Sequence, residues 1–172
     1  MKRFRLGLLA AAMLFATGCS SNVKDGISYL EEENYEEAIV CFQEDVDNDA
    51  NLAEAYRGLG IANFELENYQ EAADAFENAL KNDAKESAAI YSFLGTSYLK
   101  LEDNEKALEN YHAALEQQDC SEELKQEILY NEIGVYENMG EWDTVEEKVK
   151  AYMDAYPEDK SLEKTVEFLE TR

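Results

Sequence analysis

The sequence predicts an all-α protein, and three observations support this fold class. One pattern of residues repeats along the chain every 34 or 35 positions, as the spacing of Gly26, Gly60 and Gly95 shows. Within each repeat, apolar residues recur three and four positions apart, which is the period of an α-helix. No segment shows the alternation of apolar and polar residues that is typical of a strand. Repeated helical units of this length stack on one another, because a single helical hairpin cannot bury its apolar face alone.

Four copies of the repeated unit follow one another, and we expect them at approximately 23–50, 53–86, 88–121 and 126–158. The second copy carries the pattern at Tyr56, Leu59, Gly60, Tyr69, Ala72, Phe76, Ala79 and Leu80. The third carries it at Tyr91, Leu94, Gly95, Tyr98, Ala107, Tyr111, Ala114 and Leu115. This pattern resembles the tetratricopeptide repeat (TPR). The resemblance implies a right-handed superhelical solenoid of about four helix-turn-helix hairpins with a concave groove that binds other proteins.

The end of the array is less regular than its middle. In the fourth copy, Val145 and Val149 stand where the family places a small residue and an aromatic one, so we expect looser packing there. Beyond it, residues 159–172 carry Leu162 and Val166 on one helical stripe. Because a terminal repeat needs its outer face covered, this last segment is predicted to be a C-terminal capping helix.

Polar residues mark the start of the second helix in two of the repeats. Asn34 is followed three positions later by Glu37, and Asn68 is followed by Glu71. At this spacing the first side chain accepts a hydrogen bond from the helix backbone, and the acid accepts one from the backbone of the capping residue. We therefore expect a reciprocal capping pair at each place.

The amino terminus has the features of an export signal. Three basic residues precede an apolar run over residues 6–16, which is shorter than the roughly 20 residues needed to span a bilayer. The letters that follow, LFATGCSS, resemble the bacterial lipoprotein signal, in which the Cys is lipidated and becomes the first residue of the mature protein. The resemblance implies a signal peptide over 1–18, a lipidated Cys19 and a short tether over 19–22. Ordinary signal cleavage beside an incidental Cys is the alternative.

This leader implies a chain held by lipid, with palmitate-type acyl chains, on the extracytoplasmic face of a bacterial cell membrane. The whole chain has a net charge of −24, and without the three basic residues of the leader 12 Lys plus Arg stand against 39 Asp plus Glu, a charge near −27. So acidic a surface repels nucleic acid, and no nucleic-acid partner is expected. The acidic side chains are interpreted as solvated helix faces, with attraction to a basic partner as the other interpretation.

Neither a metal nor a cofactor is expected. Asp45, Asp47 and Asp49 have the alternate spacing of a calcium loop, but that loop needs Gly where Ala50 stands and a bidentate Glu where Tyr56 stands. The sequence also has no Gly-rich phosphate loop and no pair of histidines for zinc. The alternating aspartates are therefore interpreted as part of a solvated helix end.

We do not expect an enzyme. The single histidine, His112, falls between the packing positions Tyr111 and Ala114, which favours a packing role over that of a general base. Cys41 and Cys120 belong to different repeats, and neither has a neighbouring nucleophile motif or the spacing of metal ligands.

The binding surface can be predicted from the helical wheel. In each first helix, the positions opposite the packed stripe line the concave groove in the family. The candidate partner-binding residues are Glu54, Arg57, Ile61, Phe64, Ser92, Thr96, Leu99, Asn131 and Val135. Exposed apolar residues tend to mark contact sites, so Ile61 and Phe64 favour a surface for a protein or peptide. For Phe64, packing against the neighbouring repeat is the competing interpretation.

Two functions remain open from the sequence. The first is a membrane-anchored scaffold that grips an extended segment or helix of an envelope protein in the groove. The second is a receptor for a small ligand or peptide that passes its ligand to a transporter or enzyme. An open groove would favour the scaffold, and a closed pocket with converging polar groups would favour the receptor.

Overall fold

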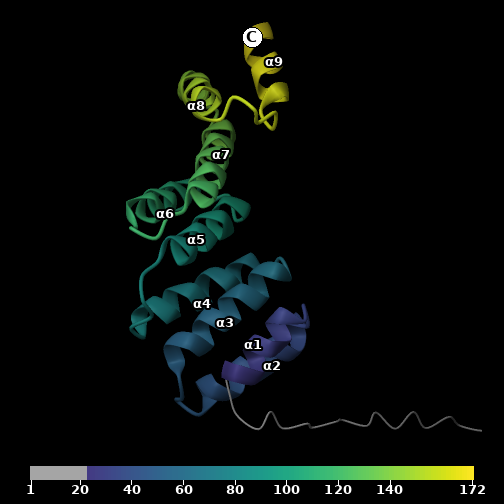
Figure 1. The fold of residues 1–172 in the computed structure, drawn as a ribbon, viewed down its shortest axis with the longest axis vertical. Coiled ribbons are helices and arrows are strands. Elements are labelled where there is room, and N and C mark those ends of the chain that lie inside the picture. The colour runs from purple at the N-terminus through teal and green to yellow at the C-terminus, as the bar shows by residue number, and fades with distance from the viewer. Residues whose placement is uncertain (1–22) are drawn as a thin grey trace, which may run out of the picture.

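The computed structural model of the chain describes residues 23–172 (Figure 1). These residues form helices and no strand. The helices are α1 (Val23–Glu31), α2 (Tyr35–Asp47), α3 (Leu52–Glu65), α4 (Tyr69–Lys81), α5 (Ala88–Lys100), α6 (Asn104–Glu116), α7 (Glu122–Met139), α8 (Trp142–Ala155) and α9 (Glu163–Thr171). The predicted signal peptide and the predicted lipidation site, Cys19, lie outside the described residues.

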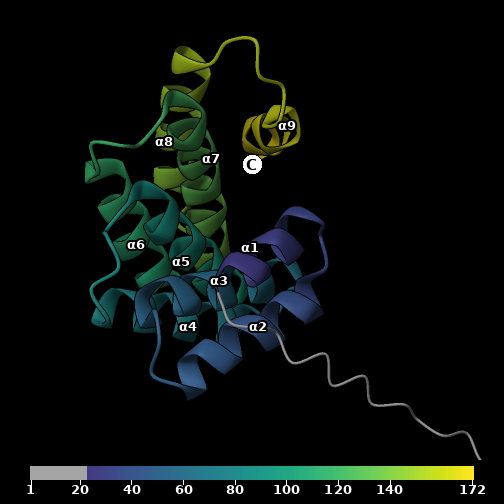
Figure 2. The same ribbon diagram turned by 60° about the horizontal axis from the view of Figure 1, so that its bottom comes forward.

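Consecutive helices pair into hairpins, and each hairpin packs on the next (Figure 1). The first helices of successive hairpins also meet directly, because α1 packs on α3, α3 on α5 and α5 on α7. In the turned view, α1 and α9 lie toward one side of the array and α6 toward the other, so the array is curved (Figure 2). The prediction of an all-α solenoid with a C-terminal helix is confirmed.

Each of the first three hairpins closes on an aromatic ring that meets a glycine. An added Cβ would lie 2.6 Å from the Phe42 ring at Gly26, 2.7 Å from Phe76 at Gly60 and 2.6 Å from Tyr111 at Gly95. All three rings are fully buried. The glycines of the repeat are therefore required by close approach, because any side chain there would overlap the ring.

The fourth hairpin lacks this contact. An added Cβ at Gly134 would meet nothing within 4 Å. Val149 occupies the place of the ring in this hairpin and is too short to reach the glycine. The residues at this end form a separate, smaller core that contains Ile133, Val145, Val149 and Tyr152.

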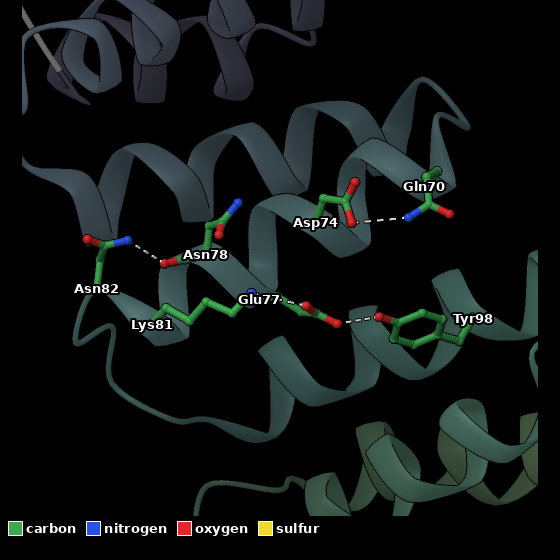
Figure 3. Close-up of polar contacts among 7 residues, drawn as sticks. All are labelled: Gln70, Asp74, Glu77, Asn78, Lys81, Asn82 and Tyr98. Atoms are coloured by element: carbon green, nitrogen blue, oxygen red, sulfur yellow. Dashed lines mark hydrogen bonds and ion pairs between the residues drawn. The ribbon is translucent and has the colours of Figure 1, made fainter.

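Polar contacts add to the packing between the second and third hairpins. Tyr98 of α5 donates a hydrogen bond to Glu77 of α4, which also pairs with Lys81 at 3.3 Å (Figure 3). The hydrogen bond from Tyr98 and the nearby Lys81 hold the pKa of Glu77 below its usual value, against the opposing effect of its partial burial. Lys106 of α6 lies 4.5 Å from the centre of the Tyr98 ring, so this cluster joins three helices.

The predicted capping pairs do not form. Asn34 and Asn68 do precede α2 and α4, but neither side chain caps its helix. Their amide nitrogens donate backwards instead, Asn34 to Glu32 at 3.1 Å and Asn68 to Asn63 at 3.3 Å. Each asparagine side chain therefore donates a hydrogen bond to a residue that precedes it, and it does not form the N-terminal cap that its spacing predicts.

Three other helices have side-chain caps. Ser87 accepts from the backbone of α5, Asp103 from that of α6 and Ser121 from that of α7. Each of these oxygens satisfies one backbone N–H group that the helix itself cannot pair.

A loop carboxylate fixes the C-terminal segment. Asp159 accepts hydrogen bonds from Gln126 of α7 at 2.6 Å and from Tyr152 of α8 at 2.6 Å, as well as from Ser161. Three residues later, Leu162 is buried against the last hairpin, and α9 follows. Between Val23 and Arg172, no helix combines the length and the apolar character that a membrane crossing would require.

Candidate functional site

Three neighbouring hollows run across the first helices of the N-terminal hairpins. One lies between the starts of α1 and α3 (about 400 Å³), the second between α1 and α3 (about 330 Å³), and the third between α3 and α5 (about 300 Å³). Glu54 lines all three hollows, and Arg57 lines the last two. Because they share these residues, the three hollows adjoin one another. We call them together the N-terminal groove and define it by Ile27, Leu30, Glu54, Arg57, Ile61 and Lys85.

The groove is lined by both apolar and charged side chains. Ile27, Leu30 and Ile61 line the same hollow and provide apolar surface there, and Ile27 is 38% exposed. Arg57 and Lys85 form no ion pair with any residue between positions 23 and 172. Their donors are therefore free to meet a carboxylate or a carbonyl oxygen.

Three of the predicted site residues lie in the groove, namely Glu54, Arg57 and Ile61. Phe64 instead packs edge-to-face against Phe93 at 4.8 Å and Tyr69 at 5.7 Å, the arrangement that the competing interpretation describes. Leu99 packs against the central core as a half-buried residue. The structure thus brings together three candidates of α3, Glu54, Arg57 and Ile61, while Phe64 in the last turn of this helix packs against other rings.

Ser92 and Val135 do not present their side chains to a partner. Ser92 is 5% exposed and Val135 is fully buried. The helical wheel places both on the groove face, but Val135 packs into the central core with residues of α4, α5 and α6, and a wheel drawn for one helix does not show its neighbours. Their side chains contribute to packing rather than to an exposed surface.

Thr96 and Asn131 both contact the buried hydroxyl of Tyr111. The Thr96 hydroxyl lies 3.0 Å from that of Tyr111, and the Asn131 side chain is also hydrogen-bonded to it. Burial, only partly offset by these hydrogen bonds, raises the pKa of Tyr111 to about 12. Tyr111 is therefore neutral at ordinary pH, and Thr96 and Asn131 are used to satisfy its hydroxyl.

Sequence reasoning missed a buried carboxylate at the junction of α6, α7 and α8. Glu132 is 1% exposed, Lys148 Nζ lies 2.8 Å from its Oε2, and His112 Nε2 lies 2.9 Å from its Oε1. The signal is visible in the repeat register, because Glu132 stands where Gly58 and Phe93 stand in the second and third copies. His112 therefore has a structural partner in another helix.

Sequence reasoning also missed part of the groove. Ile27 and Leu30 come from the first copy, in which the helical wheel predicts no groove residue, and Lys85 comes from the loop before α5. Within the described part of the chain, no group of three or more His, Cys, Asp or Glu side chains is placed to hold a metal ion.

Two family models, both of the tetratricopeptide repeat, match the chain, one over residues 24–88 and the other over 88–118. Residues 24–118 are tetratricopeptide repeats. The predicted TPR resemblance is confirmed, and these models indicate no catalytic family. A search of curated proteins finds no match.

Among solved structures, the TPR fold of this chain is similar to the crystal structure of YrrB, a TPR protein with an unusual peptide-binding site. The two share 25% sequence identity and superpose with a TM-score of 0.66, over 78% of this chain and 67% of YrrB. A TPR array of this kind is a protein interaction scaffold.

Proposed function

We propose that this TPR protein is a lipid-anchored scaffold on the extracytoplasmic side of a bacterial membrane, and that it binds an extended segment of another envelope protein in its N-terminal groove. The observation that carries the proposal is the row of adjoining hollows across α1, α3 and α5, with Glu54 and Arg57 shared between neighbouring hollows. A surface that is long, shallow and partly apolar suits an extended chain.

The shape of the hollows favours a scaffold over a receptor for a small ligand. Small-molecule sites enclose most of the surface of their ligand. The three hollows are instead only partly enclosed and open to solvent on one side. A segment that enters from one end and leaves at the other fits such a surface better than a compact molecule does.

The proposed anchor would place the groove beside the membrane. Only residues 20–22 separate Cys19 from the start of α1, and at about 3.3 Å per residue this tether reaches on the order of 10 Å. Since α1 forms one wall of the groove, the partner segment would have to come close to the lipid headgroups.

Photo-crosslinking in the native membrane tests the scaffold. A photoreactive amino acid is placed at Arg57 or at Ile61, both in the groove, and at the exposed Lys164 of α9 as a control. We expect both groove positions to capture the same protein and the control position not to capture it. Equal capture from all three positions, or none from the groove, would contradict the proposal.

Mass spectrometry of the mature amino terminus tests the anchor. We expect a chain that begins at Cys19 and carries acyl groups, and we expect Cys19→Ala to leave the membrane fraction or to stay unprocessed. Several acyl chains give stable membrane binding, because each buried methylene contributes about 0.8 kcal/mol. A mature chain that lacks lipid would contradict the anchor. It would not affect the groove proposal, which the crosslinking experiment tests separately.

A further inference from the structure

The charge of the N-terminal groove differs from that of the whole molecule. The chain as a whole carries 15 Lys plus Arg against 39 Asp plus Glu. The three hollows are lined by Lys24, Arg57 and Lys85 on the basic side and by Glu31 and Glu54 on the acidic side. The strongly acidic chain therefore places an excess of positive charge at the surface proposed to bind a partner.

The cations of the groove are free to act on a ligand. Five lysines elsewhere, Lys81, Lys106, Lys125, Lys148 and Lys160, are already paired with carboxylates. Arg57 is exposed and sits between the hollow that opens toward α1 and the one that opens toward α5. A guanidinium at this place can grip a carboxylate through two parallel hydrogen bonds.

On the basis of the proposed function, we propose that the groove selects an extended segment with an internal Asp or Glu side chain flanked by aliphatic residues. The acid would pair with Arg57, next to Lys85, and an aliphatic side chain would lie on Ile27, Leu30 and Ile61. Glu54 supplies an acceptor for backbone N–H groups of the same segment. The partner is therefore an acidic and aliphatic strand rather than a basic one.

The position of Arg57 favours an Asp or Glu side chain inside the bound peptide segment over a carboxylate at the end of that segment. Hollows continue on both sides of Arg57, so a chain bound there has room to pass in both directions. Packed helices lie about 10 Å apart, and the path from α1 over α3 to α5 is two such steps, about 20 Å. An extended segment of about six residues covers this length. A chain that ended at Arg57 would leave one hollow empty.

The overall negative charge does not prevent this pairing. At physiological ionic strength, charges separated by more than about 8 Å are largely screened from each other. A carboxylate in contact with Arg57 and Lys85 therefore responds mainly to these two cations and to Glu54. The long-range repulsion slows the approach of an acidic partner more than it weakens the complex.

Peptide binding to the purified full-length chain tests the inference. The probe is a fluorescent peptide of about eight residues, acetylated and amidated, with a central glutamate between two leucines. Its matched partner has glutamine in place of the glutamate. A third peptide ends at the central position in a free carboxylate. Each is measured against the wild-type chain, Arg57→Gln and the control Lys100→Gln, which removes an exposed lysine outside the groove.

We expect the glutamate peptide to bind about three- to tenfold more tightly than the glutamine peptide, the range of an exposed to partly buried charge pair. Arg57→Gln should remove this preference, so that the glutamate and glutamine peptides bind the variant with equal affinity, while Lys100→Gln should keep the preference. Circular dichroism checks that the variants fold.

The contrary outcomes separate this inference from the proposed function. Equal binding of the glutamate and glutamine peptides to the wild-type chain would overturn the acidic preference but keep the groove as a peptide site. Tighter binding of the peptide with a terminal carboxylate would overturn the internal position of the acid. If none of the peptides bound, both the inference and the groove as a peptide site would fail.

Discussion

Gly58 shows how a single residue sets the contact between two hairpins. It lies in α3 against the ring of Phe42, which belongs to α2 and also meets Gly26 of α1. A buried ring is thus enclosed by two glycines from successive hairpins. Gly134 of α7 is the opposite case, since nothing lies within 4 Å of the place a Cβ would take.

We predict opposite effects for the same substitution at these two glycines. Gly58→Ala forces the buried Phe42 ring to move, and overpacking of this kind costs about 1–3 kcal/mol. Gly134→Ala adds a methyl group in open space within a helix, where alanine is favoured over glycine by about 0.5–1 kcal/mol. Urea unfolding measures both. Equal destabilisation by the two changes would show that the packing around Phe42 and Gly134 is not as described.

A second prediction concerns Tyr98, which is 5% exposed and donates to Glu77. The folded chain holds the pKa of Glu77 below its usual value of 4.5. The ionised Glu77 carboxylate therefore stabilises the fold above pH 4.5, and this contribution is lost as the pH falls through the lowered pKa. Tyr98→Phe should cost about 1 kcal/mol near neutral pH, a figure reduced for the partial exposure of Glu77, and less in acid. Unfolding at several pH values measures this. The control is Tyr130→Phe, at an exposed ring, and a pH-independent cost of Tyr98→Phe would contradict the ionic part of the contact.

At the scale of the element, α9 depends on the loop that precedes it. Hydrogen bonds from Ser161, Tyr152 and Gln126 hold the pKa of Asp159 far below its usual range, with partial desolvation opposing them. These bonds tie the loop to α7 and α8 before Leu162 enters the core. The apolar contacts of α9 itself come mainly from Val166, Leu169 and the contact of Phe168 with Trp142 at 4.8 Å.

We predict that Asp159→Ala loosens α9 without unfolding the repeats. Backbone amides of residues 163–171 should exchange with solvent faster, because the loop loses its attachment to α7 and α8. Amides of α3 to α6 should be unchanged. Glu158→Ala, at an exposed neighbouring carboxylate, is the control. If α9 kept its protection in Asp159→Ala, burial of Leu162 alone would be enough to hold it.

At the scale of the whole molecule, the core is divided. The central cluster joins α4, α5, α6 and one side of α7, and a second cluster joins α2, α3 and α4. The smaller C-terminal cluster contains Ile133 from the other side of α7. Glu132 lies beside this boundary, held by Lys148 and His112.

This division predicts uneven stability along the array. In repeat proteins each unit is stabilised mainly by its neighbours, so the middle units, covered on both sides, open least. Amides of α4, α5 and α6 should exchange most slowly, and those of α8 should exchange faster although α8 is of similar length. Native-state hydrogen exchange in dilute denaturant measures this order. Uniform exchange rates from α2 to α8 would indicate one cooperative unit instead.

The sequence by itself determined the helical repeats, because the spacing of residues such as Gly60 and Phe76 is a local property that each hairpin repeats. It also determined Arg57 and Ile61 as groove residues, since both follow from the face of a single helix. Only the tertiary structure decided that Val135 and Ser92 are buried, that Ile27 and Lys85 complete the groove, and that Glu132 has its partners in α6 and α8. The physical reason is that burial and ion pairing depend on what the neighbouring hairpin places opposite a residue, and the period of one helix carries no information about that neighbour.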